Sequence, residues 1–97
     1  MKNLTLRNLT KVCNGIWHGD NALLDQEISA ITTDSRKIEK DCLFVPIVGE
    51  RVDAHRFIPD VMTKGALATL SERELPEADY AYIQVEASLQ AVKDIAE

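Results

Sequence analysis

Two polar segments of the sequence carry residue types that bind phosphate groups. The first is TTDSR at residues 32–36, where Ser35 offers a hydroxyl and Arg36 a guanidinium that contacts two oxygens at once. The second is GERVDAH at residues 49–55, where Gly49 allows the backbone to approach a flat ligand closely. A predicted helix begins within this second segment, and the free N–H groups of a helix N-terminus favour anions. Together the two segments indicate a site for a phosphorylated small molecule.

Purely structural roles would also explain these residues, and the pattern leaves both interpretations open. Asp34 is typical of a residue that caps a turn, and Asp53 is typical of a helix N-cap. Arg36 could simply pair with Asp41 or Asp53. A histidine such as His55 is more often a hydrogen-bonded loop residue than a catalytic base.

Several kinds of catalytic and metal site are missing from the sequence. It has no GxxxxGK[ST] segment, which would form a phosphate-binding loop for ATP, and no GxSxG or HExxH segment. Cys13 and Cys42 form no CxxC pair, and with His18 and His55 they give only four soft ligands without paired spacing. We therefore predict no catalytic residue and no metal site, with both thiols buried as small apolar groups.

Strands and helices alternate along the chain. Apolar spacing and capping residues predict helices at residues 6–14, 54–64 and 87–96. Strands are predicted at residues 16–18, 28–33, 42–48, 67–70 and 80–85. This order predicts an α/β domain with a mixed sheet of four to six strands and helices packed on it. In open α/β sheets ligands bind beyond the carboxyl ends of strands, and both polar segments follow a predicted strand.

The strand predicted at residues 42–48 combines two opposing signals. It is continuously apolar, which predicts burial on both faces of the sheet. Pro46 lies inside it and has no N–H group to donate, so it favours a bulge or an unpaired stretch.

The composition and charge of the chain argue against some classes of binding partner. The chain has 97 residues, of which 45% are hydrophobic and 28% charged, which is typical of one globular domain. The net charge is −5, which argues against nucleic-acid binding. The longest apolar run is far shorter than the roughly 20 residues that cross a bilayer, and no signal peptide is present. We therefore expect a cytoplasmic protein with no membrane partner.

The two polar segments in tandem resemble the N-terminal domain of the Mur ligases. Residues 31–66 read ITTDSRKIEKDCLFVPIVGERVDAHRFIPDVMTKGA. They follow the pattern T-D-[ST]-R, a spacer, LF-V, G-x-R-x-D-[GA]-H-x-F-I and a GA near the helix end. The opening LTLRNLTKVCNGIWHGD also resembles the first helix and strand of that family. The sequence departs from the pattern at Lys40-Asp41, where Pro-Gly or similar is usual, and in having DAH for DGH.

The resemblance implies a single domain at residues 1–97 that holds the UDP part of a UDP-N-acetylmuramoyl-peptide substrate. The whole ligase would use ATP and Mg²⁺ to form an amide bond through an acyl phosphate. This chain would need no cofactor and would be inactive alone, because the central ATP-binding domain and the C-terminal domain would lie outside it. The predicted helix at residues 87–96 ends without a capping residue, which agrees with a chain cut from a longer one that contacts the central domain.

The resemblance also assigns roles by motif position. The residues implied to contact the UDP moiety are Thr33, Ser35, Glu50, Arg51 and Val52. The residues implied to support them are Asp34, Arg36, Gly49, Asp53 and His55. Asp34 would orient its loop, and Arg36 would lie near the phosphates or brace the loop. Because Glu50 is acidic, uracil recognition there would use backbone groups.

Four functions remain open at this point. The segment GERVDAHRF is most similar to the Mur ligases that add D-alanyl-D-alanine to UDP-N-acetylmuramoyl-tripeptide. Sister ligases that add the third amino acid are the first alternative. The others are a free-standing nucleotide- or anion-binding module and an interaction module that docks a partner on the acidic second half of the chain.

Overall fold

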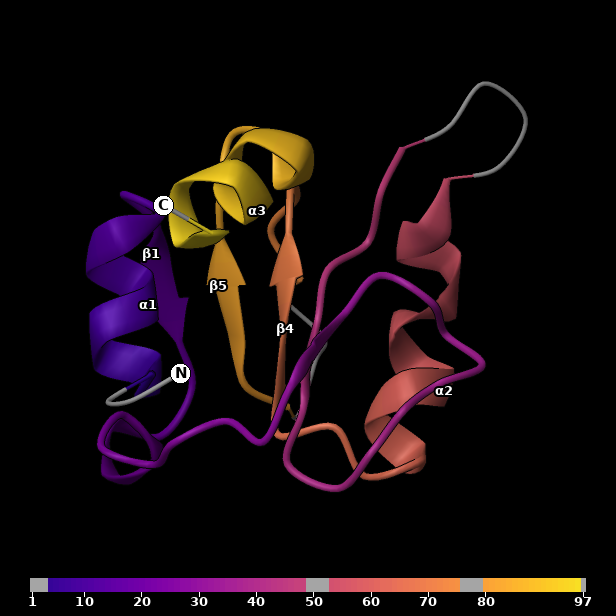
Figure 1. The fold of residues 1–97 in the computed structure, drawn as a ribbon, viewed down its shortest axis with the longest axis horizontal. Helices are drawn as coiled ribbons and strands as arrows, with labels where there is room; N and C mark the ends of the chain where they lie inside the picture. Colours follow the sequence, from indigo (N-terminus) through magenta and orange to yellow (C-terminus); the bar gives the residue numbers. More distant parts are fainter. Residues whose placement is uncertain (1–3, 49–52, 76–79, 97) are drawn as a thin grey trace.

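The computed structural model describes residues 4–48, 53–75 and 80–96 of the chain. This part centres on a five-stranded sheet with the order β1-β5-β4-β3-β2 (Figure 1). β1 is antiparallel to β5 and all other neighbours are parallel, so the predicted α/β domain with a mixed sheet is confirmed. The strands are β1 (Ile16–His18), β2 (Ile31–Thr32), β3 (Leu43–Phe44), β4 (Ala68–Ser71) and β5 (Tyr82–Gln84).

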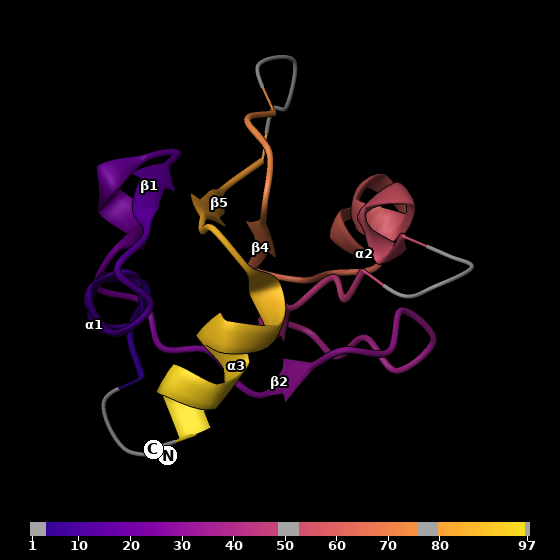
Figure 2. The same ribbon diagram turned by 90° about the horizontal axis from the view of Figure 1, so that it is seen from above.

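Helices cover both faces of this sheet. Figure 2 shows α1 and α3 on one face and α2 on the opposite face. The helical elements in the described ranges are α1 (Leu6–Val12), η1 (Asn21–Leu23), η2 (Ala54–Phe57), α2 (Ile58–Thr63) and α3 (Ser88–Ala96), where η marks a short 3₁₀ helix. The three predicted helices are therefore confirmed, with the middle one divided into η2 and α2.

The helix α1 begins at the predicted residue but ends two residues earlier than predicted. Thr5 caps the start, because its side chain accepts a hydrogen bond of 3.1 Å from the N–H of Asn8. Asn14 has a φ of 55°, a left-handed conformation that ends a helix. The next residue, Gly15, lies so close to β5 that no side chain fits. A Cβ atom at this position would lie 2.5 Å from Cγ2 of Ile83.

Two predicted strands are much shorter in the structure. The strand expected at 28–33 is reduced to β2, which pairs with β3 only at Ile31 and Thr32. Before it, the Ser29 N–H donates to the carbonyl of Asp41, which lies ahead of β3. The strand expected at 42–48 is reduced to β3. Val45 still donates to the Thr32 carbonyl at 2.9 Å, but Pro46 has no N–H to continue the ladder.

β3 is fully buried and joins two apolar clusters. Leu43 and Val45 pack into the cluster under α1 and α3, and Phe44 packs on the opposite side against Ile58 and Val61 of α2. The predicted burial of this segment on both faces is therefore confirmed for residues 42–46, whereas Val48 is 51% exposed. Ala54 and Phe57 of η2 pack against the same cluster, so the sheet, α2 and η2 are held together there.

The two cysteines are free and buried, as predicted. Burial, together with the negative charge of Asp94, raises the pKa of the Cys13 thiol to about 11. Within residues 4–48, 53–75 and 80–96, no group of three or more His, Cys, Asp or Glu side chains is arranged to hold a metal ion. None of the helices found in those ranges is long and apolar enough to span a bilayer.

Candidate functional site

The candidate site lies at the carboxyl edge of the parallel strands. The first polar segment leaves the sheet at the end of β2, and η2 begins beyond the end of β3. The turn after β4 and the start of α3 after β5 lie at the same edge (Figure 1). Gly49, Glu50, Arg51 and Val52 lie outside the described residues, so their roles stay predictions.

One open pocket at this edge joins the two polar segments. It has a volume of about 530 Å³ and is lined by Thr33, Asp34, Ser35, Arg36, Ala54 and Phe57. The structure brings together the four predicted site residues that follow β2. Ala54 and Phe57 come from η2 and give the pocket an apolar wall. Neither residue was identified from the sequence as a site residue, although both belong to the pattern G-x-R-x-D-[GA]-H-x-F-I.

Asp34 shapes the loop that carries Ser35. Its carboxylate accepts hydrogen bonds from the Arg36 backbone N–H at 2.9 Å, from Arg36 Nε at 3.1 Å and from Arg36 Nη2 at 3.1 Å. These side-chain and backbone bonds from Arg36 lower the pKa of Asp34 to about 2. The turn-capping role predicted for Asp34 is confirmed. The pairing of Arg36 with Asp41 or Asp53 was wrong, because the nearest carboxylate is two residues away.

Ser35 presents a hydroxyl that is not engaged elsewhere in the described part of the chain, where no hydrogen bond from it is found. Its backbone carbonyl accepts a hydrogen bond of 3.3 Å from Lys64 Nζ, which also pairs with Asp60 at 3.0 Å. Lys64 therefore places a cation beside the loop that carries Ser35. Nothing in the local sequence marked Lys64, because it lies 29 residues further along the chain.

Asp53 and His55 do not line the pocket but hold η2 in place. Asp53 caps η2 by accepting from the His55 N–H at 2.9 Å, and it also pairs with the Arg73 guanidinium. The His55 side chain is 2% exposed. Its ring contacts Asp53 through Nδ1 at 2.6 Å and accepts from the Glu72 N–H through Nε2 at 2.8 Å. The predicted N-cap and the hydrogen-bonded loop histidine are both confirmed.

The protonation state of His55 follows from these partners. Because the Glu72 N–H is a donor, Nε2 must accept, so the ring proton lies on Nδ1 and points to Asp53. Burial lowers the pKa of His55, and the negative charge of Glu72 opposes that shift in part. The ring is therefore neutral at pH 7 and is poorly placed to act as a base toward the pocket.

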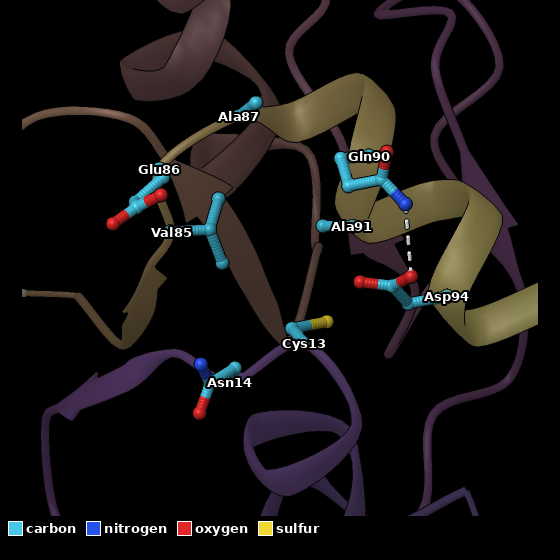
Figure 3. Close-up of a pocket in the computed structure, with 8 residues that line it drawn as sticks. All are labelled: Cys13, Asn14, Val85, Glu86, Ala87, Gln90, Ala91 and Asp94. Carbon is cyan, nitrogen blue, oxygen red and sulfur yellow. Dashed lines mark hydrogen bonds between the residues drawn. The ribbon is translucent and has the colours of Figure 1, made fainter.

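A second pocket has the wrong charge for a phosphate. It has a volume of about 250 Å³ and lies between the end of α1 and the start of α3 (Figure 3). The carboxylates of Glu86 and Asp94 line it, and Asp94 accepts a hydrogen bond of 3.0 Å from the Gln90 amide. Two carboxylates repel an anion, so the pocket beside Ser35 is the better candidate site.

A family model described as "Mur ligase family, catalytic domain" matches residues 27–97. The chain belongs to the Mur ligase family. The resemblance seen in the two motifs is therefore confirmed, and it extends to curated Mur ligases. The UDP-N-acetylmuramoyl-tripeptide--D-alanyl-D-alanine ligase of Escherichia coli (strain K12) is 44% identical over 75 residues, which cover 77% of this chain and 16% of that protein.

A second Mur ligase relative is named for a different activity. The UDP-N-acetylmuramoyl-L-alanyl-D-glutamate--2,6-diaminopimelate ligase of Cytophaga hutchinsonii is 46% identical over 76 residues, covering 74% of this chain and 15% of that protein. The chain thus spans only 15–16% of the length of these two curated relatives.

Solved structures of Mur ligases share the fold. The structure titled "Crystal structure I of MurF from Acinetobacter baumannii" matches 93% of this chain and 19% of its own, with 33% sequence identity and a TM-score of 0.82. A second structure from that organism, titled as a D-alanyl-D-alanyl ligase, gives the same identity and TM-score and also covers 93% of this chain but 20% of its own. The expected Mur ligase N-terminal fold is therefore confirmed.

Proposed function

We propose that this chain is the domain of a Mur ligase that holds the UDP moiety of a UDP-N-acetylmuramoyl-peptide. The observation that carries the proposal is that Ser35, Arg36 and Phe57 line the same pocket. A hydroxyl and a guanidinium suit the oxygens of a diphosphate. The aromatic wall suits the flat face of a uracil ring. This combination needs no broad basic surface, which agrees with the net charge of −5.

Within the family, the function best supported is addition of D-alanyl-D-alanine to the tripeptide precursor. Three observations favour this activity: the sequence of residues 49–57, a curated relative from Escherichia coli, and the two Acinetobacter baumannii structures. The second candidate is addition of the third amino acid. It rests on the Cytophaga hutchinsonii relative, whose identity of 46% is slightly higher over a similar length.

The amide-forming chemistry of the whole ligase is proposed to lie outside this chain. The family description names a catalytic domain, but these 97 residues do not fit ATP and Mg²⁺. The sequence has no phosphate-binding loop for ATP, and the described residues hold no cluster of three or more side chains suited to a metal. The chain's own contribution is to bind and orient the nucleotide end of the precursor.

The purified chain is therefore expected to hydrolyse no ATP. Release of inorganic phosphate from Mg²⁺–ATP would be measured with the folded chain and with a heat-denatured sample as the control. Equal release in both samples is the expected result. Metal-dependent release above the denatured control would contradict this part of the proposal.

Replacing Ser35 with alanine tests the proposed pocket. A lost hydrogen bond to a charged group costs about 1.5–3 kcal/mol. Ser35→Ala should therefore weaken binding of UDP to the chain by roughly tenfold or more, as measured by an NMR titration. Arg51→Ala, in the second polar segment, should also weaken binding of UDP.

Ser29→Ala is the matched control, because the Ser29 hydroxyl bonds to the Lys40 carbonyl and does not line the pocket. It should leave the dissociation constant for UDP unchanged. If Ser35→Ala and Arg51→Ala both bind UDP as tightly as the unaltered chain, the pocket formed by the two segments is not the nucleotide site.

A further inference from the structure

A chain of hydrogen bonds connects η2, which forms one wall of the candidate pocket, to the turn after β4 and the start of α3. His55 of η2 donates to Asp53 through Nδ1, at 2.6 Å, and accepts from the Glu72 N–H through Nε2, at 2.8 Å. The Glu72 carboxylate in turn accepts from the Ser88 N–H at the start of α3, at 2.7 Å. One imidazole ring therefore joins η2 to the turn after β4.

This connection requires a neutral ring. Nε2 can accept from the Glu72 N–H only while it carries no proton. A second proton on the ring would place two N–H donors against each other at 2.8 Å. Because the ring is buried, water has little access to replace the lost bond. The protonated ring must therefore separate from Glu72, and either η2 or the turn after β4 has to move.

Burial favours the neutral form of the ring, and the negative charge of Glu72 opposes it only in part. The charged groups that face His55 are Asp53, at the start of its own element, and Glu72 and Arg73, on the turn after β4. Asp53 would stabilise an imidazolium, but its carboxylate is already paired with the Arg73 guanidinium. The Glu72 carboxylate is engaged by the N–H of Ser88. Each acidic group near the ring thus already has a partner.

We propose that His55 is a positioning residue for the nucleotide pocket, whose neutral ring holds η2 against the end of β4 and whose protonation releases it. Ala54 and Phe57, which line the pocket, lie one residue before and two residues after His55 in the same short helix. Release of η2 therefore moves the apolar wall of the pocket. The nature of the ligand rests on the proposed function, whereas the movement of η2 does not.

The first test follows binding against pH with UDP-N-acetylglucosamine as the probe. A free terminal phosphate titrates near pH 6, and this probe avoids that complication because both phosphates are esterified. Affinity of the unaltered chain should fall about fivefold to tenfold between pH 7.5 and pH 5. In His55→Gln the amide oxygen can still accept from Glu72 but does not titrate, so its affinity should not change with pH.

His18→Gln is the matched control, since the sequence has only two histidines and His18 contacts Gln84 and Tyr82 instead of the pocket. This variant should follow the pH profile of the unaltered chain. Identical profiles for the unaltered chain and His55→Gln would overturn the proposal.

The second test needs no ligand and separates the two possible failures. Nitrogen NMR of the histidine rings should show His55 with its proton on Nδ1 at pH 7.5. Backbone amide signals of Ala54, Phe57 and Glu72 should shift together as the ring is protonated, and should not do so in His55→Gln. A proton on Nε2 at pH 7.5, or amide signals that ignore the ring, would overturn the role of His55. If these shifts occur but the probe binds at no pH, the proposed nucleotide function fails while the movement of η2 stands.

Discussion

Replacing Phe44 with alanine is expected to lower the free energy of unfolding by about 3–5 kcal/mol. The Phe44 side chain is fully buried and packs against Ile58 and Val61, so its removal leaves a cavity between the sheet and α2. That loss is a large part of the roughly 5–15 kcal/mol by which domains are usually stable. Urea unfolding followed by circular dichroism would measure it.

Leu89→Ala provides the matched control for Phe44. Leu89 is also a large apolar residue, but its side chain is 56% exposed. Its replacement should change the free energy of unfolding by no more than about 0.5 kcal/mol. Equal losses for the two variants would show that β3 is not the buried centre of the fold.

Replacing Asp53 with alanine is expected to lower the free energy of unfolding by about 2–3 kcal/mol. Asp53 caps η2, accepts from the His55 ring and pairs with Arg73, so one carboxylate serves three partners. Its removal leaves a buried ring donor without an acceptor. Urea unfolding would give the loss in stability, and UDP titration should show weaker binding as η2 loses its support.

Two further variants define what Asp53 does. Asp53→Asn keeps a good N-cap but loses the charge, so its stability should fall between those of the unaltered chain and Asp53→Ala. Asp25→Ala removes a carboxylate that is 79% exposed and pairs only at the surface with Arg7, which is worth about 0–1 kcal/mol. If Asp53→Ala costs no more than Asp25→Ala, the contacts of Asp53 do not hold η2.

The order of helices and strands could be predicted because local patterns determine it. Apolar residues at helical spacing and the capping side chains of Thr5 and Asp53 mark the helices before any tertiary contact is known. Strand lengths could not be predicted, because they depend on which backbone groups meet. Ser29 bonds to Asp41 across a loop, and no pattern within residues 28–33 reveals that contact.

The candidate pocket could be predicted in part. Parallel strands bring the segments after β2 and β3 to one edge, so Ser35 and η2 were expected to lie together. The supporting partners Lys64, Glu72 and Arg73 were not found, because they lie 17 to 29 residues from the groups they contact. Such long-range pairs leave no periodic signal in the sequence.

Titration of the 97-residue chain with UDP, followed through its backbone amide signals, is the most direct measurement. The proposed function predicts saturable shifts at Thr33, Asp34, Ser35, Arg36, Ala54 and Phe57, which line the pocket at the carboxyl edge. ADP at equal concentration, with a different base, should give smaller shifts. The absence of saturable shifts, or shifts confined to the acidic pocket of Glu86 and Asp94, would contradict the proposal that this domain holds the nucleotide there.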